Sequence, residues 1–285
     1  SSGGMALAVM ALTQYKQTTG DDRYDIYIDK LGNYLLWAQE PSGRIKSYYH
    51  KYGNYSVDED ISFYIGESLL ALVLMYDLTE SSQFEQAIIR AYDFYYKDNI
   101  GRQNYNYYES PFVPWATSAF GQMTLLTQNA SYAEFAFDML DNKLRYQVST
   151  PTNDSLGNNI QGGMYSNPTI GSSSTWEGLG DCYAAAVLLN DTQHIEKYYQ
   201  AMKIGMEFVL GLQMRKEECL KYNVKYPPWV FGGFRHDFTR TIEEYPDGDG
   251  FNSTMRNDYT QHTLSAMTKV MKYFPTEFQT EIEIR

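Results

Sequence analysis

The feature that most constrains this 285-residue chain is a repeated pair of helical patterns. Each pair begins with a helix rich in Ala, Gly, Leu and Met, passes through a short polar turn, and ends with an amphipathic helix rich in aromatic and charged residues. The expected pairs are Met5–Gln17 with Tyr24–Gln39, Ile61–Leu78 with Phe84–Lys97, Trp115–Leu126 with Tyr132–Tyr146, and Trp176–Leu189 with Ile195–Leu212. One more helix of the first type, Asp258–Phe274, follows them. Repetition of one helical unit predicts a repeat architecture.

The two helix types are expected to occupy different layers. Nearly every residue from 68 to 75 is apolar, and a helix that is apolar on all sides is buried on all sides. The helix that begins at Phe84 instead carries Glu85, Arg90 and Lys97 among its apolar positions, so it is expected to pack outside. We therefore predict an all-α fold, an α/α toroid of repeated helical hairpins, with an open solenoid of the same hairpins as the main alternative.

Four connections are longer than the roughly two to eight residues usual between helices of a bundle. They cover residues 40–60, 98–114, 147–175 and 213–257. Loops of this length are more often functional than incidental, and we expect them to gather on one rim of the ring. Aromatic residues punctuate them, which is unlike a linker, so we expect a single α/α-toroid domain over residues 1–285. The start at Ser1 lacks an initiator Met and a signal pattern, as expected of an excised or processed part of a longer chain.

Composition disfavours several classes of partner. The net charge is -12 and no run of Lys or Arg exceeds two residues, which disfavours nucleic acid and anionic membranes. No apolar run approaches the roughly 18 residues of a membrane span. Tyrosine is abundant, with 27 residues, and suits either helix packing or a groove lined for sugars.

Five Asn-x-Ser/Thr sequons predict a secreted or cell-surface glycoprotein, against chance occurrence in a sequence rich in Asn, Ser and Thr. They begin at Asn54, Asn129, Asn153, Asn190 and Asn252, all in predicted loops. The two cysteines, Cys182 and Cys219, are compatible either with a disulfide or with buried free thiols.

Aromatic and acidic residues gather where the first-type helices are expected to begin. They are Tyr64, Glu67, Glu109, Trp115, Trp176 and Glu177. Acids in the first turn of a helix are stabilised by the helix dipole, which is a purely structural explanation. Aromatic rings beside carboxylates are also what carbohydrate binding and glycosidic-bond chemistry use, which makes this rim the candidate site.

The last helix is expected to carry the reacting groups. Arg256, Tyr259 and His262 are three residues apart, so they share one face of the helix. A guanidinium, a phenol and an imidazole can hold the carboxylate of an acidic sugar and move a proton beside it, and Arg235 offers a second cation. The structural alternative is that Arg256 pairs with a nearby aspartate such as Asp258.

Other chemistry has weaker support. Asp247 and Asp249 lie in an Asp-Gly-Asp-Gly run that offers oxygen ligands to calcium, but the spacing of an EF-hand and its final Glu are missing. We expect no other cofactor, because the four His are scattered and no phosphate loop, dinucleotide fingerprint or nucleophile elbow is present.

The chain is similar to α/α-toroid carbohydrate-active proteins, most of all to the C-terminal helical domain of glucuronyl C5-epimerases. Three stretches carry the similarity in the same order: residues 63–67, residues 107–113, and residues 256–259 with His262. The resemblance implies action on an anionic polysaccharide in a toroid cleft, with Tyr259, Glu109 and Arg256 as the matching residues. His262 lies one residue closer to Tyr259 than in that family.

We therefore predict an extracellular protein that acts on a uronic-acid-containing polysaccharide by abstracting the C5 proton, as an epimerase or a lyase does. The predicted catalytic residues are Tyr259, Glu109, Arg256 and His262, and the predicted substrate-binding residues are Tyr64, Glu67, Trp115, Trp176, Glu177 and Arg235. One alternative is a non-catalytic structural or adhesive surface glycoprotein that self-associates. The second is a glycoside hydrolase that uses two of the carboxylates.

Overall fold

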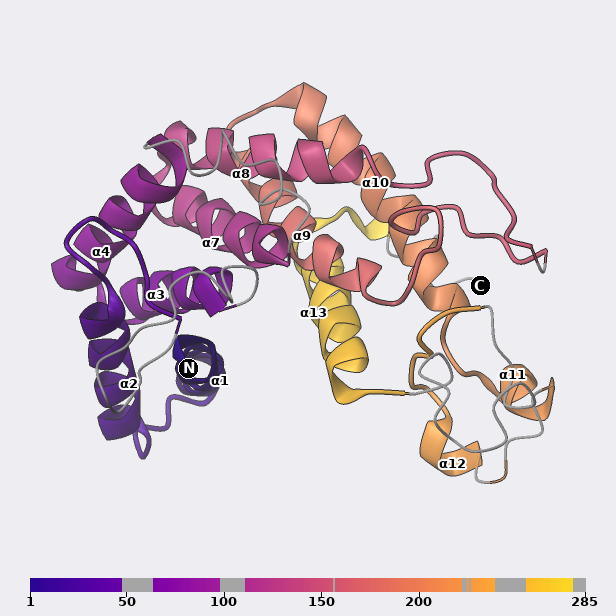
Figure 1. The fold of residues 1–285 in the computed structure, drawn as a ribbon, viewed down its shortest axis with the longest axis horizontal. Helices are drawn as coiled ribbons and strands as arrows, with labels where there is room; N and C mark the ends of the chain where they lie inside the picture. The colour runs from indigo at the N-terminus through magenta and orange to yellow at the C-terminus, as the bar shows by residue number, and fades with distance from the viewer. Residues whose placement is uncertain are drawn as a thin grey trace. The chain divides into compact units, whose positions relative to one another are not determined.

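The computed structural model describes residues 1–47, 64–97, 111–155, 157–221, 225, 227–238 and 255–278 (Figure 1). Within these ranges every regular element is a helix, and the β pairs are isolated bridges. The prediction of an all-α fold is therefore confirmed. The closure of the helices into a toroid stays a prediction.

The long helices lie where the repeat predicts them. The pairs are α1 (Ser2–Thr19) with α2 (Asp25–Ala38), α3 (Gly66–Thr79) with α4 (Ser82–Tyr92), α7 (Phe112–Thr127) with α8 (Ala130–Leu144), and α9 (Ser172–Leu188) with α10 (Thr192–Gly211). α4 continues into a π-helical turn, η2 (Asp93–Lys97), and the last long helix is α13 (Asn257–Tyr273). Two short helices, α11 (Lys216–Lys221) and α12 (Pro227–Val230), lie in a connection where the sequence pattern predicts none.

Local chemistry explains several helix ends. The Ser1 side chain accepts a hydrogen bond from the backbone of Gly4 and caps the start of α1. Gly20 ends that helix in the left-handed region, with φ 70°, and its N–H donates to the carbonyl of Lys16. Asp191 caps α10 in the same way as Ser1 caps α1, by accepting from the backbone of His194. These caps satisfy backbone groups that a helix end otherwise leaves unpaired.

The described chain divides into two compact units, one of residues 1–143 and 184–189, the other of residues 144–183 and 190–285. In the first unit, α3 packs against both α1 and α7, while α2 and α4 pack against α3 (Figure 1). The first eight residues of α3, 66–73, are all buried, whereas α4 buries one side through Phe84, Ala87, Ile88 and Ala91. The predicted contrast between inner and outer helices is therefore present in the pair of α3 and α4, whereas α1, which is also predicted to be buried on all sides, buries only Ser2, Gly3, Ala6, Val9 and Thr13.

Aromatic rings fill the space between α4, α7 and α8 in the first unit. Tyr92 meets Tyr132 edge-on with ring centroids 5.0 Å apart, and Phe120 lies 5.0 Å from Phe135. The Tyr92 hydroxyl donates to the carbonyl of Ser131 at 3.0 Å. Tyr92 and Tyr132 thus serve helix packing, which is one of the two roles that the sequence allows for its tyrosines.

The second unit is built on α9, α10 and α13. The Trp176 indole of α9 lies over Gly205 of α10, where a Cβ would be 2.6 Å from the ring. Tyr183 of α9 stacks on Phe274, just after α13, with centroids 3.9 Å apart. Cys182 and Cys219 are both buried free thiols, so the disulfide considered from the sequence is not formed. Among the described residues, no helix combines the length and apolar character that a membrane span requires.

Candidate functional site

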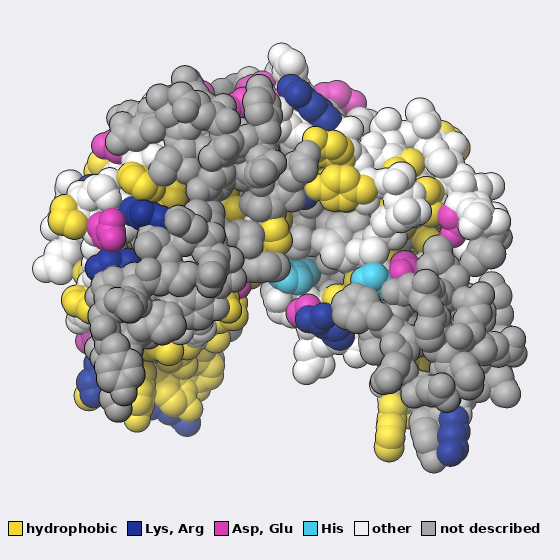
Figure 2. Space-filling view, viewed as in Figure 1, with side chains coloured by type: hydrophobic (Ala, Val, Ile, Leu, Met, Phe, Trp, Pro, Cys, Tyr) yellow, Lys and Arg dark blue, Asp and Glu magenta, His cyan; other side chains and the backbone are white. Residues whose placement is uncertain are grey.

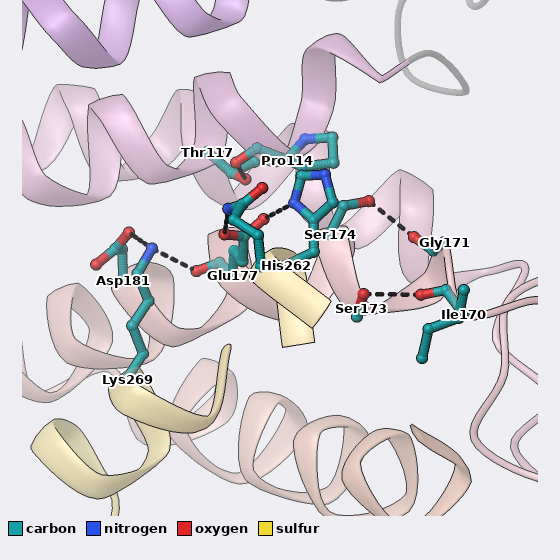
Figure 3. Close-up of polar contacts among 11 residues, drawn as sticks. Pro114, Thr117, Ile170, Gly171, Ser173, Ser174, Glu177, Asp181, His262 and Lys269 are labelled. Atoms are coloured by element: carbon teal, nitrogen blue, oxygen red, sulfur yellow. Dashed lines mark hydrogen bonds and ion pairs between the residues drawn. The ribbon is translucent and has the colours of Figure 1, made fainter. Parts of the chain in front are cut away.

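A histidine–carboxylate pair joins α13 to α9 in the second unit (Figure 3). His262 Nδ1 lies 2.5 Å from Glu177 Oε2, and the Gln261 side chain reaches the other oxygen, Glu177 Oε1, at 3.3 Å. The Glu177 side chain is only 7% exposed, while that of His262 is 20% exposed. The carboxylate is thus held inside and the imidazole lies between the interior and the surface.

An ion pair two turns further along α13 reinforces this contact. Lys269 Nζ lies 2.5 Å from Asp181 Oδ2 and also donates to the carbonyl oxygen of Glu177 at 3.0 Å. Asp181 is completely buried, and Glu177 and Asp181 are four residues apart, so both face α13 from one side of α9. Lys269 therefore neutralises a buried charge and bonds the backbone of the residue that holds His262.

A second histidine–carboxylate pair lies beside Tyr259, the residue one turn before His262. His236 Nδ1 is 2.8 Å from Asp237 Oδ2, and the His236 ring centroid is 5.5 Å from that of Tyr259. The carbonyl of His236 accepts from the N–H of Ile170, which ties this segment to the start of α9. Two imidazoles, each bonded to a carboxylate, thus lie at the start of α13: His262 belongs to the helix, and His236 lies beside its residue Tyr259.

Tyr259 is buried while its neighbour Arg256 is exposed. Burial raises the pKa of the Tyr259 phenol, although the nearby Arg256 guanidinium acts in the opposite direction. Arg256 makes a two-point contact with Asp258, with Nε 3.0 Å from Oδ1 and an Nη 2.9 Å from Oδ2. Its guanidinium also lies 5.2 Å from the centre of the Tyr259 ring. Tyr259 is therefore a neutral phenol at physiological pH, that is, a proton donor.

The bond from Nδ1 to a carboxylate gives each imidazole a defined chemistry. A carboxylate accepts the Nδ1 proton, so in the neutral imidazole the lone pair is on Nε2, and the carboxylate stabilises the imidazolium that forms when Nε2 takes up a proton. Histidine side chains (cyan) reach the surface on the face drawn in Figure 2, with acidic and basic side chains beside them. The arrangement therefore suits general acid–base catalysis.

Four of the residues predicted from the sequence come together in this second unit. They are Glu177, Arg256, Tyr259 and His262. Arg235 belongs to the same unit and places its guanidinium 5.1 Å from the Phe238 ring centre. Tyr259 and His262 lie in the first two turns of α13, as predicted, whereas Arg256 is the extended residue just before the helix.

Three other predicted residues belong to the first unit and pack between its helices. A Cβ at Gly3 would lie 2.2 Å from Tyr64 and 2.3 Å from Glu67, so both side chains lie against α1. Trp115 of α7 packs against Gly66 of α3 in the same way. A Cβ at Gly66 would lie 2.6 Å from the Cβ of Trp115. Their part in sugar binding stays a prediction.

One expectation needs correction, and one alternative is decided. The Trp176 ring is completely buried over Gly205, so it offers no face on which a sugar could stack. Arg256 pairs with Asp258, which is the structural alternative that the sequence leaves open. Because this pair is exposed, an incoming carboxylate can replace Asp258 at small cost.

The remaining predicted residues fall into two groups. Glu109, Asn54, Asn252, Asp247 and Asp249 lie outside the described residues. Asn129, Asn153 and Asn190 are described and exposed. Over the part of the chain that the structure describes, no group of three or more His, Cys, Asp or Glu is placed to hold a metal ion.

Sequence reasoning missed His236, Asp181 and Lys269. A usable signal was present for each: His236 is followed directly by Asp237, Asp181 lies one helical turn after Glu177, and Lys269 lies two turns after His262. The last two spacings predict residues on the same side of α9 and of α13, but they do not reveal that these sides face each other.

Comparison with solved structures gives a likeness in fold. The chain aligns with the crystal structure of a sugar epimerase from a ruminal bacterium at a TM-score of 0.57, with 11% sequence identity, over 96% of this chain and 76% of that one. At this identity the likeness concerns the fold. No protein-family model matches the chain, and the search of curated proteins found no match.

Proposed function

We propose that this protein is a carbohydrate epimerase or lyase in which His262 removes a proton from a sugar carbon. The observation that carries the proposal is the 2.5 Å contact between His262 Nδ1 and the buried Glu177 carboxylate. This contact directs the lone pair of the imidazole to Nε2 and stabilises its protonated form, as a general base requires. The fold likeness to a sugar epimerase supports the same class of reaction.

Tyr259 and the second pair supply the opposite proton transfer in this proposal. The phenol is kept protonated by burial, so it can donate a proton to the carbanion on the other side of the sugar carbon. His236, held by Asp237 next to the Tyr259 ring, can return a proton to the phenol. Inversion at carbon needs one group that removes and one group that returns the proton, and these residues provide both.

The proposed substrate is a uronic-acid-containing polysaccharide outside the cell, with proton abstraction at C5. The sugar carboxylate makes the C5 proton acidic and would replace Asp258 on the Arg256 guanidinium, which is exposed and already arranged for two-point binding. The exposed sequons support an extracellular location.

A non-catalytic surface glycoprotein is the second candidate function. The pairing of Arg256 with Asp258 and the burial of Tyr259 favour it, because both residues are already satisfied within the protein. A glycoside hydrolase has less support, since it needs two carboxylates available for the sugar. Glu177, Asp181 and Asp237 are each engaged by His or Lys.

The test is proton exchange in deuterated water. The protein is incubated with uronic-acid polysaccharides and, in parallel, with neutral reducing disaccharides, and both deuterium at the sugar carbons and new unsaturated chain ends are read by NMR. We expect deuterium at C5 of a uronic acid from an epimerase or unsaturated ends from a lyase, and a loss of at least about 100-fold of that product in the H262Q variant. H194Q is the matched control, because His194 makes a similar 2.6 Å contact with Asp191 at the start of α10, away from the proposed reacting groups.

The outcomes separate the candidates. Exchange that H262Q abolishes and H194Q retains supports the epimerase or lyase. Exchange only in neutral sugars would keep the chemistry and overturn the uronic-acid substrate. No exchange and no unsaturated product with any sugar would overturn the epimerase or lyase and leave the non-catalytic glycoprotein or the glycoside hydrolase, which breaks no C–H bond.

A further inference from the structure

We propose that Ser174 of α9 binds the reacting sugar by accepting a hydrogen bond from one of its ring hydroxyls. The inference rests on the proposed function, because it gives a task to a side chain that lies beside the proposed general base, His262. Ser174 is partly exposed, so a ligand can reach it. The register of α9 against α13, the hydrogen bonding of Ser174 and the charges around it each support this assignment.

The helices α9 and α13 run in the same direction along their contact. Glu177 of α9 contacts His262 of α13. Further along both helices, Asp181 contacts Lys269. Residues that precede Glu177 therefore face residues that precede His262. Ser174 comes three residues before Glu177, and residues three apart lie on one side of a helix, so Ser174 is on the side of α9 that faces α13.

The segment just before α9 agrees with this register. The Ile170 N–H donates to the carbonyl of His236 at 2.7 Å, and the His236 ring centroid is 5.5 Å from that of Tyr259. Ser174 lies along the chain between Ile170 and Glu177, and thus between the two histidine–carboxylate pairs. In Figure 3 its side chain lies beside the imidazole that Glu177 holds. The proposed reaction places the sugar carbon between that imidazole and the Tyr259 phenol, so the bound sugar lies next to Ser174.

The hydrogen bonding of Ser174 leaves its oxygen able to accept but not to donate. The hydroxyl lies 2.8 Å from the carbonyl oxygen of Gly171. A serine hydroxyl has one proton and two lone pairs, and a carbonyl oxygen can only accept, so the proton of Ser174 is already used. Within the described part of the chain, no donor contacts the Ser174 oxygen. A ligand that bonds to this oxygen must therefore bring the proton, as a sugar hydroxyl does.

The charges around Ser174 disfavour a sugar carboxylate at this position. The Glu177–His262 pair carries a negative charge when the imidazole is neutral, which is the form that takes up a proton, and like charges repel. The exposed guanidinium of Arg256 lies 5.2 Å from the centre of the Tyr259 ring and offers the carboxylate its cation. A carboxylate at Arg256 and a ring hydroxyl at Ser174 would fix one sugar at two points, and thereby decide which carbon faces His262.

Ser173 provides a matched control within the same helical turn. Its hydroxyl donates to the carbonyl of Ile170 at 2.7 Å, which is the same type of bond one residue earlier, but Ser173 is completely buried. The variants S173A and S174A therefore each remove one bond from a hydroxyl to a carbonyl, and only S174A also removes an acceptor that a ligand can reach. The S174T variant keeps a hydroxyl at the position.

Isothermal titration calorimetry in the H262Q background tests the assignment, because that variant should not turn the ligand over. The probes are a heparosan hexasaccharide, which contains uronic acids, and cellobiose, which is neutral. S173A, S174A and S174T are each combined with H262Q. A second series uses analogues of the probe that binds, with the hydroxyl at C2 or at C3 of the reacting sugar replaced by hydrogen.

We expect S174A to bind the probe about two- to tenfold more weakly than its parent, as for the loss of one hydrogen bond, and S173A and S174T to bind as the parent does. One of the two deoxy analogues should bind the parent more weakly by a similar factor and show no further loss in S174A, because the same bond is already missing. With the catalytic His262 present, the S174A change should raise KM more than it lowers kcat.

An unchanged Kd in S174A, an equal loss in S173A, or no binding of either probe would overturn the assignment of Ser174. The failure of the proposed reaction is distinguishable. Proton exchange by the wild type together with an unchanged Kd in S174A would overturn the role of Ser174 alone. Weaker binding by S174A, in a protein that exchanges no proton and forms no unsaturated product, would overturn the reaction alone and support Ser174 as a residue that binds sugar.

Discussion

Lys269 of α13 is bonded to Asp181 of α9, whose side chain is completely buried, with 2.5 Å between Nζ and Oδ2. The approach of the two helices depends on Gly180, because a Cβ at that position would lie 2.7 Å from the Cβ of Lys269. The same ammonium holds the carbonyl of Glu177. The ion pair therefore sets the spacing of α9 and α13 next to the His262–Glu177 pair.

Replacing Lys269 by methionine should destabilise the protein strongly. The K269M variant leaves a buried carboxylate without its ammonium, which costs about 3–5 kcal/mol in the free energy of unfolding. Urea denaturation measures the loss. The double variant K269M/D181L removes both charges and should recover most of it, whereas equal stability of K269M and the wild type would show that the pair contributes nothing.

The E177Q variant tests the role of the carboxylate behind His262. Glutamine is nearly the same size, but it carries no charge to stabilise the imidazolium, so turnover should fall by about 100-fold or more with the fold retained. Proton exchange in deuterated water gives the rate and circular dichroism gives the fold. D191N makes the same change beside His194 and should keep full activity. Full activity of E177Q would remove the carboxylate from the mechanism.

Two glycine-to-alanine variants should have opposite effects on stability. G205A places a methyl group 2.6 Å from the Trp176 ring, which is fixed in the core, and should cost about 1–3 kcal/mol. G4A adds a methyl group on the exposed side of α1, where the nearest atom is 3.5 Å away, and should stabilise that helix by about 0.5–1 kcal/mol. Thermal unfolding of both variants checks this contrast. Equal melting temperatures would show that Trp176 can move away from α10.

Stability should fall in alkaline solution because of buried tyrosines. Burial raises the pKa of Tyr92 to about 12, against about 10 in the unfolded chain. Below about pH 10 both states keep the proton; between about pH 10 and 12 only the unfolded state loses it, so the free energy of unfolding decreases as the pH rises. Burial raises the pKa of Tyr132 and Tyr183 as well, which adds to the effect.

Urea denaturation at neutral pH and at about pH 11 measures this dependence. The free energy of unfolding of the Y92F variant should be about 1 kcal/mol lower than that of the wild type at neutral pH, because the hydrogen bond to Ser131 is removed. As the pH rises, the free energy of unfolding should fall less in Y92F than in the wild type. An equal alkaline loss in both proteins would exclude Tyr92 as a source.

Expression in a glycosylating host should add N-linked glycans at the exposed sequons. Asn129, Asn153 and Asn190 are accessible in the folded protein, so enzymatic deglycosylation should lower the mass, and each Asn→Gln variant should lose one glycan. An unmodified chain from the secretory pathway would contradict the prediction that the protein is a secreted glycoprotein.

The sequence alone determined the long helices, their order and the contrast in burial between α3 and α4. The apolar character of α3 and the amphipathic pattern of α4 are local properties, because helical periodicity depends on residues three and four positions apart. For the same reason Tyr259 and His262 could be assigned to one side of the last helix before any contact was known.

Only the tertiary structure decided which groups meet. His262 is bonded to a glutamate 85 residues earlier in the chain, and Lys269 to an aspartate 88 residues earlier. Trp176, which the sequence pattern places at the start of a helix, lies in the second turn of α9 and is buried because Gly205 on α10 leaves room for its ring. Periodicity specifies the side of a helix on which a residue lies, but the partner of that side depends on how distant helices pack, and this is a property of the whole folded chain.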